Sequence, residues 1–302
     1  MFKPFPFIVL VLMVLVSPNG FAQSPASPGV RVERNLVFAS PGTNTLRMDL
    51  YLPAGHAGNV PVVVLIYGGA WMMRNMWTEV PRARWLARNG YAAAVIDYRL
   101  SSEALFPAQI YDCKAAVRWL RASAAQYGLD ADHIAAWGDS SGGHLACLLG
   151  TAGNVPALEG GLGNTNQSSR VQAVVDFFGP TDFLKMEAEA LPGSWINHNS
   201  PKAPEALLIG GPIGQNKEKV EEANPIEYVT PDAPPFFIAH GDADLLVPWQ
   251  QSELLFQALQ NARVAVTFYR VAGAGHAGPE FNSVTMRGAV LAFLDKYLKT
   301  NQ

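Results

Sequence analysis

The sequence predicts an α/β fold with one mostly parallel, eight-stranded sheet and helices on both of its faces. Short apolar runs alternate with longer helix-like segments through most of the chain, and some runs, such as 62–66, are apolar throughout. Alternation of this kind indicates a parallel sheet, and a strand covered by helices on both faces reads as a continuous apolar run. The 302 residues are 49% hydrophobic and 16% charged, which suits one domain with a large core.

The elements follow in chain order. Segments 30–38 and 46–52 are expected to pair as antiparallel strands at one edge. The remaining strands are expected at 62–66, 91–97, 133–137, 171–177, 235–240 and 264–270, with helices near 78–89, 108–126, 141–150, 249–260 and 283–299. Residues 181–230 break the alternation and are rich in Pro, Gly, Asn and Glu. An insertion this long beyond the C-terminal strand ends predicts a small cap; a surface excursion packed on the side is the alternative.

A glycine-rich turn links the expected strand 133–137 to the helix 141–150. The run Gly138-Asp139-Ser140-Ser141-Gly142-Gly143 fits G-x-S-x-G with Ser140 at its centre. A strand, a tight turn and a helix are the context of a nucleophile elbow. The glycines are needed there because side chains beside a strained turn would collide with the strand and the helix. The alternative is a glycine-rich loop with a capping serine.

A serine nucleophile needs a general base and a third group to orient that base. His276 follows the expected strand 264–270, and an acidic loop with Asp242 and Asp244 follows strand 235–240. Both loops lie past strand ends, where a parallel sheet collects its active site. Asp242 comes early in its turn, where a short carboxylate caps backbone N–H groups, whereas Asp244 is freer to reach His276.

The loop after strand 62–66 supplies further candidates. Its small residues let backbone N–H groups approach a developing oxyanion, so the expected donors are the amides of Gly69, Ala70 and Ser141. Three aromatic residues are candidates for lining an aryl-binding cleft, with simple packing as the alternative: Tyr67, Trp71 and Trp195. His144 and His240 are expected to be structural.

Together these motifs resemble the α/β-hydrolase superfamily, and more closely the hormone-sensitive-lipase-like esterases and the bacterial feruloyl-esterase-like (BD-FAE) group. The segments that carry the resemblance are 106–120, 137–146, 174–182, 240–248 and 273–276. It implies hydrolysis of carboxylic esters without a metal or organic cofactor. It also implies Asp244 as the partner of His276, because the matching turn reads His-Gly-x-x-Asp-x-x-Val-Pro at 240–248. The chain departs from the pattern at Tyr67, where His is usual, and at Ala70, where a third Gly is usual; neither change removes an amide.

Net charge and the arrangement of Cys and His residues give no indication of a nucleic-acid partner, an anionic surface or a metal site. A net charge of −3 does not indicate nucleic acid or an anionic surface as a partner. We see no Cys/His spacing typical of a metal site. The two cysteines, Cys113 and Cys147, lie in expected helices and are predicted to be buried free thiols, with a disulfide as the alternative.

The N-terminus is expected to be a signal peptide, residues 1–22, followed by a hydrolase domain at 23–302. Residues 7–16 form an apolar run that is short for a membrane span, and Gly20-Phe21-Ala22 offers small residues for cleavage before Gln23. The mature protein is therefore expected to be periplasmic or secreted, without stable membrane insertion. An uncleaved membrane anchor is the alternative.

The sequence thus predicts a secreted serine carboxylesterase. Its substrate is expected to be a small-molecule or polymer-borne ester, with aryl, feruloyl and acetyl esters all compatible. Oligomeric state is not indicated. Two alternatives are a serine exopeptidase, which usually carries a large extra domain, and a non-catalytic ligand-binding homologue, which typically loses the serine or the histidine.

Overall fold

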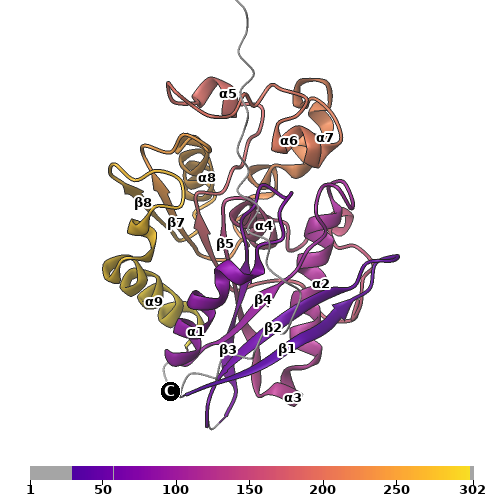
Figure 1. The fold of residues 1–302 in the computed structure, drawn as a ribbon. Helices are drawn as coiled ribbons and strands as arrows, with labels where there is room; N and C mark the ends of the chain where they lie inside the picture. Colours follow the sequence, from indigo (N-terminus) through magenta and orange to yellow (C-terminus); the bar gives the residue numbers. More distant parts are fainter. Residues whose placement is uncertain (1–28, 57, 300–302) are drawn as a thin grey trace, which may run out of the picture.

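A computed structural model describes residues 29–56 and 58–299. Its sheet has eight strands in the order β1-β2-β4-β3-β5-β6-β7-β8 (Figure 1). The strands are β1 (Val30–Ala39), β2 (Leu46–Pro53), β3 (Val60–Ile66), β4 (Ala92–Ile96), β5 (Leu129–Asp139), β6 (Ala173–Phe177), β7 (Phe236–Gly241) and β8 (Val266–Val271). Strand β2 pairs antiparallel with β1 and β4, and all other pairs are parallel. The expected signal peptide lies outside the described residues.

Helices cover both faces of the sheet, as the sequence predicts. They are α1 (Val80–Arg88), α2 (Ala108–Ala122), α3 (Ala124–Tyr127), α4 (Ser141–Thr151), α5 (Met186–Glu189), α6 (Pro204–Ile209), α7 (Lys217–Ala223), α8 (Gln250–Asn261) and α9 (Val284–Leu298). Helices α2, α4 and α8 contribute to one apolar core and α1 and α9 to a second, so the two cores lie on opposite faces (Figure 1). The eight-stranded, mostly parallel prediction is confirmed.

Burial along the strands follows their position in the sheet. The inner strands β3 and β4 are buried at every residue, which accounts for their continuous apolar sequences. The edge strand β8 contains no fully buried residue. The expected helix 108–126 is divided, because Ser123 leaves the helical conformation between α2 and α3.

The insertion between β6 and β7 contains α5, α6 and α7 and lies beyond the strand ends at the top of the sheet (Figure 1). It is tied to the main domain by backbone hydrogen bonds from Phe106 to Leu208 and from Trp195 to Leu245. Leu208 also belongs to the core beneath α2 and α4. These contacts favour a cap over a surface excursion packed on the side.

The two cysteines, Cys113 in α2 and Cys147 in α4, are both buried and free, which confirms the prediction of two unbridged thiols. Within the described residues, no helix has the length and apolar character needed to span a membrane.

Candidate active site

Ser140 occupies the turn between the end of β5 and the start of α4. Its φ of 54° and ψ of −121° are values that residues other than glycine rarely adopt. Close packing requires the flanking glycines, because a Cβ on Gly138 would collide with the carbonyl of Gly142, and one on Gly142 with the carbonyl of Ile66. The local sequence therefore produces the predicted elbow, with Ser140 in the wall of a cleft.

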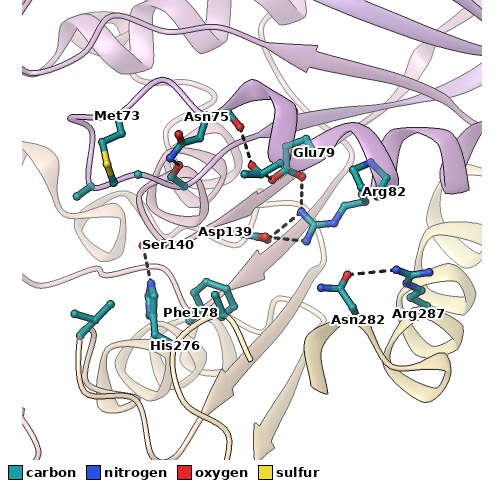
Figure 2. A pocket seen from close by; sticks show the side chains of 17 residues that line it. Met73, Asn75, Glu79, Arg82, Asp139, Ser140, Phe178, His276, Asn282 and Arg287 are labelled. Carbon is teal, nitrogen blue, oxygen red and sulfur yellow. Dashed lines mark hydrogen bonds and ion pairs between the residues drawn. The ribbon is translucent and has the colours of Figure 1, made fainter. Parts of the chain in front are cut away.

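His276 connects Ser140 to an aspartate. Its Nε2 lies 3.0 Å from the Ser140 Oγ (Figure 2), and its Nδ1 lies 2.7 Å from Oδ2 of Asp244. Because an ionised carboxylate only accepts hydrogen bonds, Nδ1–H donates to Asp244, and Nε2 is left to accept from the serine hydroxyl. This is the arrangement that a serine nucleophile requires of its general base.

The two candidate aspartates have different partners. Asp244 is buried and faces His276, whereas Asp242 Oδ1 accepts a 2.7 Å hydrogen bond from the backbone N–H of Gly273. Asp242 thus caps a backbone N–H of a loop 31 residues away, whereas the nearby N–H groups of its own turn donate to Asp244, so the local cap that the sequence predicted at Asp242 lies at Asp244 instead. Only Asp244 is brought to His276.

Four hydrogen bonds hold the Asp244 carboxylate. Its Oδ1 accepts from the backbone N–H groups of Leu246 (2.8 Å) and Val247 (3.0 Å). Its Oδ2 is shared by His276 and by Nε2 of His240, at 3.2 Å. Burial would raise the pKa of Asp244, but hydrogen bonds from His240 and His276 outweigh it and hold that pKa well below its usual range. Asp244 is therefore ionised at neutral pH.

His240 is more than a packed core residue. Its Nε2 lies 2.9 Å from the Val247 carbonyl, so that nitrogen carries the proton, and its Nδ1 lies 2.7 Å from the hydroxyl of Ser252. The ring thus fixes the loop that carries Asp244. The expectation that His240 is structural omitted this contact. The His-Gly-x-x-Asp spacing is the signal that could have indicated it.

The loop after β3 has an unusual backbone. Gly69, Ala70 and Trp71 have φ values of 148°, 56° and 55°. Ala70 therefore adopts the left-handed conformation despite its Cβ. A Cβ on Gly69 would meet the Met73 carbonyl at 2.6 Å, so glycine is required there. Ala70 lines the cleft beside Ser140, and the Ser141 N–H, at the first position of α4, has no partner within its own helix.

Two cavities flank Ser140 and His276. The larger, of about 590 Å³, is called the large cleft here (Figure 2). Several of its lining residues are exposed: Met73, Thr78, Pro81 and Asn282. The other, of about 70 Å³, is called the small pocket. Its lining residues are Ala70, Trp71, Ser140, Ser141, Pro180, Ile196, Pro204, Glu205, Leu246, Val247 and His276, and none of these is exposed.

A charged network in the wall of the large cleft was not expected from the sequence. The Arg82 guanidinium binds Asp139 through two nitrogens (3.1 and 2.7 Å) and Glu79 at 2.6 Å (Figure 2). Arg82 also lies over the Trp137 ring, 4.4 Å from its centroid. Burial raises the pKa of Glu79 to about 7, against the opposing effect of Arg82. The network anchors Asp139, the residue before Ser140. The presence of Asp139 in the G-x-S-x-G run was the one feature of the sequence that could have indicated this network.

The three aromatic candidates have different environments. Tyr67 is fully buried, stacks on Tyr98 and donates to Asp97 at 3.0 Å, so it does not line the cleft as expected; its hydroxyl finds its partner inside the core. Trp71 does line the small pocket. Trp195 is 76% exposed and is absent from the described linings of the large cleft and the small pocket.

Two other rings support the site. The Phe178 ring meets His276 edge-on with centroids 4.6 Å apart, a contact that sequence reasoning missed. His144 lies under the cap, where its Nε2 donates to the Ala223 carbonyl at 2.7 Å. Burial lowers the pKa of His144 to about 4, which fits its expected structural role. Among the described residues, no cluster of His, Cys, Asp or Glu is arranged to hold a metal ion.

Comparison with known proteins identifies the family. Residues 48–259, well over half of the chain, match the family model BD-FAE. The chain belongs to the BD-FAE family. This confirms the resemblance on which the esterase expectation partly rests.

Relatives of this BD-FAE chain include esterases of Mycobacterium tuberculosis. It is 35% identical over 196 residues to the probable carboxylic ester hydrolase LipM, and the aligned region covers 65% of this chain and 44% of LipM. It is 32% identical over 225 residues to the esterase LipC, with coverage of 72% and 52%. The chain therefore spans about half the length of these curated relatives.

Solved structures resemble the BD-FAE chain over most of its length. A truncated carbohydrate esterase from gut microbiota is 34% identical, with a TM-score of 0.80 and coverage of 89% of this chain and 97% of that one. Propionate-bound Est2, an esterase from Thermogutta terrifontis, is 25% identical, with a TM-score of 0.70 and coverage of 90% and 94%. These neighbours confirm the α/β-hydrolase fold.

Proposed function

We propose that this chain is a serine carboxylesterase in which Ser140 is the nucleophile, His276 the general base and acid, and Asp244 the group that orients His276. The observation that carries the proposal is the continuous line of contacts, 3.0 Å from Ser140 Oγ to His276 Nε2 and 2.7 Å from Nδ1 to Asp244. The esterase names of the relatives support it.

The positions of the protons along the contacts from Ser140 through His276 to Asp244 determine the order of the steps. Ser140 Oγ attacks the ester carbonyl carbon while His276 Nε2 takes the hydroxyl proton. The amides of Gly69, Ala70 and Ser141 are the proposed donors to the resulting oxyanion. Collapse of this intermediate expels the alcohol, which receives the proton from His276. Water then attacks the acyl-enzyme with His276 again as the base, and this releases the acid and restores Ser140.

The two cavities suggest which half of the ester each one binds. The small pocket is bordered by Ser140 and by both Ala70 and Ser141, so it adjoins the carbon that bears the oxyanion. The alcohol must leave before water can attack the acyl-enzyme, and the large cleft, whose lining includes exposed residues, offers it a path. We therefore assign the acyl group to the small pocket and the alcohol to the large cleft.

The size of the small pocket favours a short acyl group. A volume of about 70 Å³ has room for only a few non-hydrogen atoms beyond the carbonyl carbon. Acetyl and propionyl groups fit this volume, whereas feruloyl is far too large. The propionate bound to Est2 agrees with this choice. The large cleft can take an aryl or a sugar alcohol, and a sugar agrees with the carbohydrate esterase neighbour.

A panel of 4-nitrophenyl esters with acyl chains of increasing length tests the proposal. The specificity constant is expected to be highest for the shortest chains, and Ser140→Ala is expected to lose at least about a thousandfold of the activity. Ser141→Ala is the matched control and should keep most of it, because the proposed role of Ser141 uses its backbone amide. Near-normal turnover by Ser140→Ala would refute the mechanism. A 4-nitroanilide in the same panel tests the exopeptidase alternative.

A further inference from the structure

We propose that the small pocket selects a short acyl group that carries a hydroxyl on the carbon next to the ester carbonyl, bound between Glu205 and Trp71. This inference rests on the proposed function, because that function assigns the acyl half of the ester to the small pocket. The pocket walls are otherwise mostly apolar, with Ile196, Leu246 and Val247 among the lining residues.

Glu205 brings a carboxyl group from the cap into the wall of this pocket. It lies in α6 and is only 3% exposed. Its Oε1 lies 3.1 Å from Nδ1 of His198, which fixes the side chain. Its Oε2 is fully buried and has no hydrogen-bond partner among the residues that the structure describes. A buried carboxylate oxygen without a donor is costly, so this atom points to a ligand that supplies one.

Trp71 supplies the complementary group from the main domain. It is 2% exposed, and its ring packs against those of His144 and Phe183, with centroid distances of 5.2 and 5.5 Å. Its indole Nε1 is likewise buried and has no acceptor within the described part of the chain. The wall of the small pocket therefore includes one side chain that needs a donor and one that needs an acceptor.

The chemistry of the two groups selects the ligand. A carboxylate only accepts hydrogen bonds and an indole N–H only donates, whereas a hydroxyl can donate and accept at the same time. An ammonium group could serve Glu205 but not Trp71, and a methyl group could serve neither. Glycolyl, the smallest 2-hydroxyacyl group, adds two non-hydrogen atoms to the carbonyl carbon, within the room that about 70 Å³ provides.

The test compares phenyl acetate, phenyl glycolate and phenyl glycinate. Phenyl glycolate and water give glycolate and phenol, and phenol release is measured for all three. Each specificity constant is divided by the rate of that ester with hydroxide, which removes intrinsic reactivity. The unmodified protein is expected to prefer the glycolate over the acetate by about tenfold or more, because a site built to bind a hydroxyl discriminates against a substrate without one.

Glu205→Gln is expected to reduce this glycolate-to-acetate ratio by about tenfold, because the amide nitrogen that replaces one oxygen donates instead of accepting. Glu187→Gln is the matched control: Glu187 accepts from the backbone N–H of His198 in the same cap and does not belong to the described lining of the small pocket, so the ratio should stay unchanged.

Equal normalised constants for acetate and glycolate in the unmodified protein would overturn the inference while leaving the proposed esterase intact. A preference for the glycinate would also overturn it, in favour of an ammonium ligand of Glu205. This comparison does not depend on the folding of any variant. If the protein hydrolyses none of the three esters, the proposed function is overturned, and this inference with it.

Discussion

Replacing Asp244 with Asn is expected to abolish turnover through the tautomer of His276. Oδ1 of Asp244 accepts from the backbone N–H groups of Leu246 and Val247, so the amide oxygen of Asn takes that position. The amide NH₂ then replaces Oδ2 and donates to His276 Nδ1, which lies 2.7 Å from Oδ2. The proton of His276 moves to Nε2, which can no longer accept from Ser140.

The magnitude follows from this change. A wrong tautomer in a Ser-His-Asp triad costs about 10⁴-fold in kcat, which corresponds to about 5.5 kcal/mol of transition-state stabilisation. The assay is kcat and KM for 4-nitrophenyl acetate, together with thermal unfolding to verify the fold. We expect kcat to fall and KM to change little, because Asp244 lies behind His276 and does not touch the substrate.

Asp242→Asn is the control on the same loop. Its oxygen can still accept from Gly273, and its 3.5 Å ion pair with Arg270 is partly exposed, so it contributes little. We expect kcat to be retained and the free energy of unfolding to fall by at most about 1 kcal/mol. An inactive Asp242→Asn enzyme beside an active Asp244→Asn enzyme would refute the assignment of Asp244.

Three further outcomes are expected. Trp195→Ala should change the free energy of unfolding by less than about 0.5 kcal/mol and leave the ratio of aryl to alkyl ester hydrolysis unchanged, because the ring is exposed and lines neither cavity; a changed ratio in the ester panel would contradict this. Arg82→Met should lower the free energy of unfolding by about 3 kcal/mol in denaturant titrations, because two carboxylates lose their partner; an unchanged midpoint would contradict it. Asp176 is fully buried in β6, and Asp176→Asn should weaken the pH dependence of stability. Burial raises the pKa of Asp176 to about 7. In the folded protein its carboxyl group therefore keeps a proton that the same group releases at about pH 4 in the unfolded chain. Its contribution to stability is therefore full below about pH 4 and declines as the pH rises to about 7. Melting temperatures between these pH values should fall less for the variant than for the unmodified protein, and equal slopes would contradict the argument.

The sequence alone determined the features that depend on local backbone structure. The apolar runs predicted the sheet because a strand covered on both faces leaves no polar position along its length. The glycines around Ser140 predicted the elbow because only residues without a Cβ fit between the strand and the helix.

The tertiary structure decided which distant side chains meet. The pairing of Asp244 with His276 joins loops 32 residues apart, and the pairing of Arg82 with Asp139 spans 57 residues. The order of strands in the sheet brings both pairs together. The turn pattern at 240–248 indicated the first pair through the family resemblance, whereas no sequence pattern indicated the second. Tyr67 shows what the sequence does not determine. A tyrosine suits the wall of a cleft as well as a core, and it is buried here because Asp97 accepts a hydrogen bond from its hydroxyl inside the core.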